Sequence, residues 1–123
     1  MSDSRMIDIL LSKGIDYFNE KKFYHAHEIW EELWTDYALK DALFIQGLIQ
    51  LSVAFFHITN LNLKGSNNLF TKCLPKLKKF PSNHRGLNLA EIIDCAEKSK
   101  IQVESINKSN EFNWESAPRI IVS

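Results

Sequence analysis

A histidine and a glutamate lie four residues apart in the segment 23–34. Their side chains can bind a metal ion or transfer protons. Apolar residues of this segment recur at three- and four-residue steps, as on one face of an α-helix; they are Phe23, Ala26, Trp30, Leu33 and Trp34, continued by Tyr37. At 100° per residue, His27 and Glu31 fall on one flank of that face, one turn apart. An imidazole and a carboxylate at the edge of an aromatic core favour either a buried polar network or a metal or catalytic site.

A second polar set lies in the most hydrophobic part of the chain. Gln46, Gln50 and His57 project within about 40° of one another on an otherwise apolar helix. Buried amides and imidazoles need hydrogen-bond partners, so this polar seam has to face other polar groups or water. If the two helices pack antiparallel, the seam meets the flank that carries His27 and Glu31. The sequence therefore predicts a half-buried pocket formed by His27, Glu28, Glu31, Gln46, Gln50 and His57.

A divalent metal is one possible occupant of this pocket. His27, Glu31 and His57 could supply nitrogen and oxygen ligands to zinc, manganese or iron, with Gln50 behind them. The His27-Glu28 dipeptide begins like the H-E-x-x-H of metalloproteases, but Glu31 stands where the second histidine belongs. The alternative is structural: His27 and Glu31 form an ion pair that orients helix packing, and the glutamines bond to the backbone or to each other.

The elements that would position these residues are helices. Hydrophobic periodicity predicts five, over about residues 4–19, 22–37, 40–60, 63–79 and 89–108. The helix at 40–60 is apolar nearly all the way round, so it must be surrounded by others. Pro75 should kink the fourth helix near its final turn, and residues 81–86 are expected to form a loop. The fold class is all-α: a small bundle of about five helices built from antiparallel helical hairpins, in one domain over residues 1–110.

Individual residues are assigned to the core or the surface by the same periodicity. Met6 and Leu10 should face inward on the first helix, and Trp30, Trp34 and Tyr37 on the second, whereas His25 should be exposed. Residues 111–123 have no helical period and form an irregular tail. Trp114 and the apolar residues 120–122 of this tail should pack on the domain or on a neighbouring chain, which makes a homodimer possible.

Composition restricts the function classes. The 123 residues include 15 basic and 15 acidic side chains, so no net charge attracts nucleic acid, and no nucleic-acid partner is expected. Four lysines and Arg85 cluster near the end of the fourth helix, and we interpret this cluster as a solvent-exposed face. The lysines are Lys72, Lys76, Lys78 and Lys79.

No secretory signal fits the first residues, and residues 42–58 are too short and too polar to span a bilayer. Two separate cysteines suit reduced thiols, so we expect a cytoplasmic protein with no membrane partner.

Three motifs in order resemble one family of bacterial, archaeal and plastid proteins, the domain of unknown function number 309. They are Tyr17-Phe18-Asn19, the run from Phe23 through His27-Glu28 to Trp34, and Gln46-Gly47-Leu48-Ile49-Gln50 followed by Ala54 and His57. The resemblance covers about residues 14–77, with Ser66 in place of a usual alanine. It implies a small cytosolic all-α fold without an established activity, and it carries over the six candidate pocket residues. The first two helices also look like a tetratricopeptide hairpin, an analogy that would favour partner binding.

Two functions remain open from the sequence, with a third that depends on the tail. The first is a binding module whose pocket holds a small molecule or a protein partner. The second is a metal-dependent hydrolase in which Glu28 or Glu31 acts as general base. The third is a dimeric scaffold that uses Trp114 and the tail.

Overall fold

The computed structural model describes residues 2–120 of the chain. Within these residues the helices are α1 (Ser2–Asn19), α2 (Phe23–Asp36), α3 (Ala42–Thr59), α4 (Leu63–Leu77) and α5 (Leu89–Ser105). The all-α prediction is confirmed, and every helix begins and ends within three residues of its expected limits. Pro75 lies in the last turn of α4, which ends two residues later.

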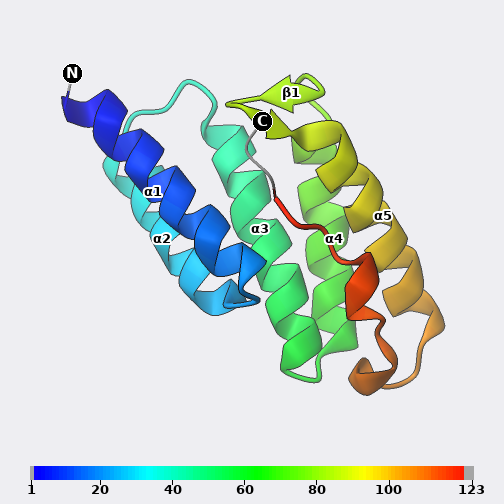
Figure 1. The fold of residues 1–123 in the computed structure, drawn as a ribbon. Helices are drawn as coiled ribbons and strands as arrows, with labels where there is room; N and C mark the ends of the chain where they lie inside the picture. Colours follow the sequence, from blue (N-terminus) through cyan, green and yellow to red (C-terminus); the bar gives the residue numbers. More distant parts are fainter. Residues whose placement is uncertain (1, 121–123) are drawn as a thin grey trace.

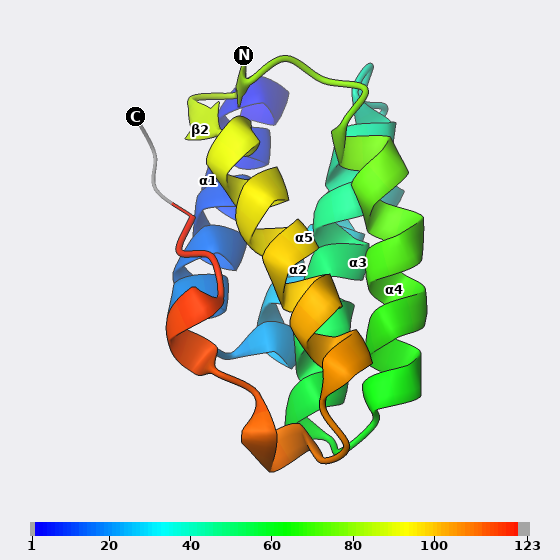
Figure 2. The same cartoon turned by 90° about the vertical axis from the view of Figure 1, so that its right-hand side faces the viewer.

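Helices that follow one another in the sequence pack side by side: α1 on α2, α2 on α3, α3 on α4 and α4 on α5. In Figure 1, α2, α3 and α4 form a back layer, and α1, the C-terminal segment and α5 lie in front of it; Figure 2 shows the same two layers from the side. Helix α3 has the length and composition to cross a membrane, with a mean hydropathy of 1.6, but 56% of it is buried inside the protein. It is the central helix of the bundle, as its apolar circumference predicts.

A close approach between α1 and α2 explains the glycine inside the first helix. A Cβ atom at Gly14 would overlap the indole ring of Trp30, which is fully buried. The indole Nε1 donates a hydrogen bond to the carbonyl oxygen of Leu11 at 3.3 Å. Gly14 therefore allows the largest core side chain to reach the α1 backbone, which compensates for its low helix propensity.

The segment after α4 is not a simple loop, contrary to our expectation. Strands β1 (Asn83–His84) and β2 (Leu87–Asn88) pair antiparallel, with Asn83 opposite Asn88 and His84 opposite Leu87. Arg85 and Gly86, the two residues between the strands, have φ values of 50° and 75°. Positive φ at both central positions is typical of the type I′ turn that closes tight hairpins.

The C-terminal segment packs against the front of the bundle. It contains two 3-10 helices, η1 (Ser109–Glu111) and η2 (Trp114–Ser116). The Trp114 ring stacks on Phe23 with centroids 5.7 Å apart, and Ile120 is buried. The Asn19 side chain holds the backbone of Ile120 by two hydrogen bonds, donating to its carbonyl at 2.7 Å and accepting from its amide at 2.8 Å. Residues 121 and 122, which we expected to pack as well, lie outside the described residues.

Two side chains expected in the core are exposed instead. Trp34 is 43% exposed and Met6 is 42% exposed. Trp34 lies 40° further round α2 than Trp30, because four residues advance a helix by 400°, and this rotation brings it to the flank of His27 and Glu31. Met6 lies a full turn before Leu10, the first buried residue of α1.

Candidate functional site

A groove of about 370 Å³ runs between α2 and α3 and is the candidate site; we call it the α2–α3 groove. It combines polar and apolar side chains from the two helices and one from α4: His27, Glu31, Trp34, Thr35, Gln46, Ile49, Gln50, Val53 and Leu69. Four of the six residues predicted for the pocket line it. The exposed face of Trp34 forms part of the same wall.

The side chains of His27 and Glu31, one helical turn apart, lie within ion-pairing distance of each other. The distance from His27 Nε2 to Glu31 Oε1 is 3.2 Å, and the Glu31 side chain is 54% exposed. The second ring nitrogen of His27, Nδ1, is buried and makes no hydrogen bond with any residue from 2 to 120. The ring tautomer decides whether Nδ1 is a donor or an acceptor, and in either case it is a polar atom without a partner among these residues.

The glutamine seam finds its partner on α4 rather than on α2. Gln50 accepts a hydrogen bond at its Oε1 from the Lys76 ammonium at 3.0 Å, and the same ammonium donates to the carbonyl of Lys72 at 3.2 Å. Lys76 thus lies beside the groove instead of on the solvated lysine face. Sequence reasoning missed this pair because its members are 26 positions apart and are separated by a turn whose geometry no local pattern fixes.

His57 lies in a neighbouring hollow. This hollow has a volume of about 120 Å³ and aromatic walls, and its lining residues are Tyr24, His27, Val53, Phe56 and His57. The His57 Nδ1 is 3.5 Å from the side-chain nitrogen of Asn62. His27 lines both hollows, so it connects His57 to the α2–α3 groove.

Glu28 lies elsewhere, and the structure does not bring it to the other candidates. It lines an outer hollow between α1 and α2 together with Tyr17, His25, Ile29 and Glu32. The reason is rotation: one residue advances a helix by 100°, so Glu28 cannot share the flank of His27. His25 is exposed, as its position on the helix predicts.

The donor set does not fit a metal ion of the kind that the sequence suggested. Within residues 2–120, no three His, Cys, Asp or Glu side chains are grouped so that they could hold a metal. His27 and Glu31 supply one pair of ligand atoms, and His57 does not join them as a third ligand. The His27-Glu28 motif adds no further ligand, because Glu28 faces away.

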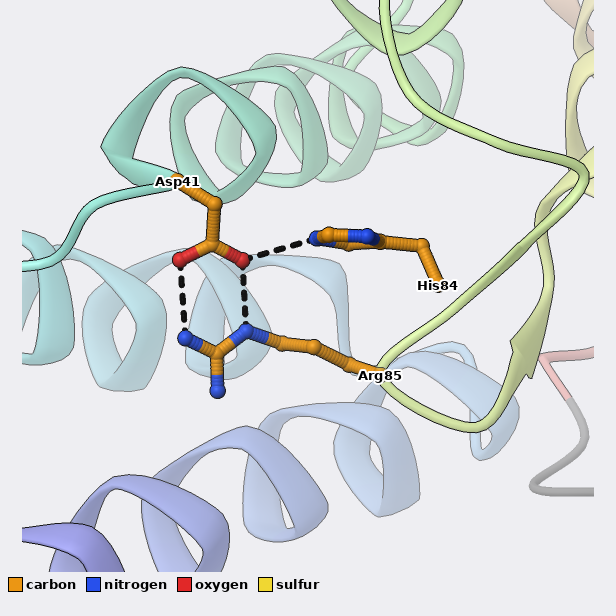
Figure 3. A network of polar contacts seen from close by, with 3 residues as sticks. All are labelled: Asp41, His84 and Arg85. Atoms are coloured by element: carbon orange, nitrogen blue, oxygen red, sulfur yellow. Dashed lines mark hydrogen bonds and ion pairs between the residues drawn. The ribbon is translucent and has the colours of Figure 1, made fainter.

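A polar network that sequence reasoning missed joins the β-hairpin to the start of α3 (Figure 3). Asp41 accepts two hydrogen bonds from Arg85, from Nε to Oδ2 at 2.6 Å and from Nη2 to Oδ1 at 2.7 Å. His84 Nε2 lies 2.9 Å from the same Oδ2, and its ring packs on Phe44 and Phe80. The Arg85 hydrogen bonds lower the pKa of Asp41 to about 2, against the opposing effect of burial.

This network and a second ion pair neutralise part of the predicted lysine face. Arg85 is paired with Asp41, and Lys78 lies 3.3 Å from Glu97 on α5. Gly86 marks a turn in the sequence, but Arg-Gly is not one of the residue pairs that predict a tight hairpin. Nothing local in the sequence links the hairpin to Asp41.

Comparison with known proteins adds a family but no activity. Residues 11–69 match the model of the family described as "Domain of unknown function (DUF309)", which confirms the resemblance seen in the sequence. An uncharacterized protein of Aquifex aeolicus (strain VF5) is 32% identical over 84 residues. That alignment covers 68% of this chain and 25% of the relative, so the chain spans about a quarter of the length of this relative. The matched family region includes all six candidate pocket residues.

Proposed function

We propose that this chain, whose residues 11–69 match the family described as domain of unknown function 309, is a binding module whose α2–α3 groove holds a small molecule. The observation that carries the proposal is the joint presence, in one groove, of an exposed tryptophan and several hydrogen-bond acceptors. Ligand sites combine an apolar surface with a few convergent polar groups in this way.

The lining residues indicate what the molecule should look like. Trp34 offers a flat apolar surface on which a planar group can stack. The Glu31 carboxylate, which accepts hydrogen bonds, is half exposed beside it, and the Gln46 amide, which carries a further acceptor oxygen, lines the same groove. A planar molecule with hydrogen-bond donors on one edge matches this arrangement, because it satisfies the acceptors while its apolar face covers Trp34.

A metal-dependent hydrolase, the other function that the sequence suggested, is not proposed. It required Glu28 or Glu31 as general base next to a metal held by His27, Glu31 and His57. Glu28 lies in a different hollow, and the described residues contain no three-ligand group.

Matched aromatic probes test the proposal. Benzamidine carries only donors on its polar edge, whereas benzoate has the same size and carries only acceptors. We expect benzamidine to shift the backbone amide resonances around Trp34 and Gln46 saturably in two-dimensional NMR spectra, and benzoate to bind more weakly. The variant Trp34→Ala should lose this response. Ile101→Ala, which truncates another exposed apolar residue on α5, is the control and should respond as the native chain does.

Equal responses in the native chain and Trp34→Ala would overturn the proposal, as would benzamidine shifts that map outside the groove. A second variant, Gln46→Leu, tests the polar wall. It keeps the volume of the side chain and removes its amide, so it should weaken benzamidine binding without changing the melting temperature.

We also propose that the protein acts in the cytoplasm. Cys73 and Cys95 are both free thiols, and burial raises the pKa of Cys73 to about 12. Unpaired thiols persist in reducing compartments. Cell fractionation of the native producer tests this location, which a membrane or secreted fraction would contradict.

A further inference from the structure

A further hollow region is lined by residues of the α1–α2 turn, the α3–α4 turn and the η1 segment. The α3–α4 turn and the η1 segment lie at the bottom of Figures 1 and 2. The region consists of two adjoining hollows of about 470 and about 370 Å³ that share Leu61, Ser109 and Asn110. We call it the end groove. It has no lining residue in common with the α2–α3 groove, and the proposed function does not use it.

Both turns that line the end groove have the same backbone form. At the end of α1, the Lys21 amide donates to Phe18 and the Lys22 amide donates to Tyr17, at 3.0 and 2.8 Å. At the end of α3, the Leu61 amide donates to Ile58 and the Asn62 amide to His57, at 3.2 and 2.8 Å. This paired pattern is the Schellman motif, whose left-handed residue is usually glycine.

Here the left-handed positions carry Lys21 and Leu61, with φ values of 63° and 60°. A side chain at such a position strains the backbone, and strain of this kind gathers at functional sites. Burial does not explain Leu61, because it is 80% exposed. Lys21 and Leu61 both line the end groove, so the two strained residues present their side chains to one place.

The chemistry of the end groove is apolar and cationic. Leu61 is joined by Leu63, Ile58 and Trp114, and the charged lining residues are Lys21 and Lys108, with no acidic side chain in the lining. The Lys21 ammonium lies over the Trp114 ring, 5.6 Å from its centroid. Ser109 is 8% exposed, and its hydroxyl makes no hydrogen bond with residues 2–120. A ligand oxygen reaching Ser109 would supply the missing partner.

We propose that the end groove binds an anionic amphiphile, a molecule with one apolar chain and a carboxylate head group. The carboxylate lies between Lys21 and Lys108, where the charges are complementary. The chain covers Leu61 and Leu63 and removes their apolar surface from water. Lys21 and Leu61, at the two left-handed positions, then both contact the ligand. Glycine at these positions would remove those contacts, which accounts for its absence.

The probe is decanoate, titrated below its micelle concentration into the full chain while tryptophan fluorescence and backbone amide resonances are recorded. Decyltrimethylammonium has the same chain with the opposite charge, and acetate has the head group without the chain. We expect saturable binding of decanoate, binding of the cation weaker by at least about tenfold, and no binding of acetate. Decanoate that does not bind, or a cation that binds equally well, overturns the proposal.

The variants Leu61→Gly and Lys21→Gly separate binding from folding. Glycine relieves the left-handed strain, so both variants should melt at the same or a higher temperature than the native chain. Each should nevertheless bind decanoate about tenfold more weakly or worse, since each loses a contact with the chain or the head group. Lys22→Ala, which removes the neighbouring lysine outside the groove, is the control and should bind normally. Native affinity in Leu61→Gly would contradict the proposal.

Discussion

The carboxylate of Asp41 and the guanidinium of Arg85, 44 positions apart in the sequence, form a two-bond ion pair that joins the residue just before α3 to the tip of the β-hairpin. Paired N–H donors that match both carboxylate oxygens are the strongest ion-pair geometry in proteins. The Asp41 side chain is mostly buried, so solvent screens this pair less than a surface pair. The pair fixes the hairpin, and with it the start of α5, to the centre of the bundle.

The first prediction concerns the pH dependence that this pair creates. Because the folded pKa of Asp41 is lowered from 3.8 to about 2, the pair stabilises the fold above pH 4, and the contribution is lost as the pH falls from about 4 towards 2. Asp41→Asn should lower the free energy of unfolding at pH 7 by about 1–2 kcal/mol. Urea denaturation of both proteins should show the difference shrinking below pH 4. Asp94→Asn, in an exposed pair with Lys98, serves as the control; a difference independent of pH would contradict the assignment.

The second prediction concerns Gly14. In an ordinary helix, Gly→Ala is stabilising by up to about 1 kcal/mol. Here the added methyl group would overlap the buried Trp30 indole, and overpacking of this kind costs about 1–3 kcal/mol. We therefore expect Gly14→Ala to lower stability by about 1–2 kcal/mol. Ser12→Ala, on the exposed side of α1, should not; thermal melts compare them, and a more stable Gly14→Ala would disprove the close approach.

The third prediction separates two tryptophans that are both partly exposed. Trp114 stacks on Phe23 and lies edge-on to Phe112, so Trp114→Ala should lower the free energy of unfolding by about 2–3 kcal/mol. Trp34 lines a groove instead, and Trp34→Ala should change stability by no more than about 0.5 kcal/mol. Guanidinium denaturation measures both. Equal losses would mean that Trp34 packs as a core residue, as the periodicity had suggested.

The fourth prediction concerns the strained turn between α3 and α4. Leu61→Gly removes a left-handed leucine that is not buried, so it should raise stability by about 1 kcal/mol. Leu61→Ala keeps the strain and should leave stability unchanged. If the alanine variant is stabilised as much as the glycine variant, the exposed side chain and not the backbone is the source of the effect.

The helices could be predicted from the sequence because their apolar spacing is a local property. The position of Trp34 could not, since periodicity gives the direction of a side chain but not how far the neighbouring helix extends to cover it. His27 and Glu31 form a pair because residues four apart on a helix always meet. The Lys76–Gln50 and Arg85–Asp41 pairs depend on how separate helices and a hairpin pack, which no spacing encodes. Glu28 was included in the predicted pocket because it belongs to the His27-Glu28 motif. Its position on the helix, 100° round from His27, already indicated that its side chain lies on a different face.

The central claim is that the α2–α3 groove is a binding site whose wall is Trp34. The most direct measurement is the dissociation constant of benzamidine by NMR titration for the native chain, Trp34→Ala and Ile101→Ala. The account predicts saturable binding by the native chain and Ile101→Ala, with affinity for Trp34→Ala weaker by at least about tenfold. Benzamidine binding that is absent from the native chain, or unchanged in Trp34→Ala, would contradict it.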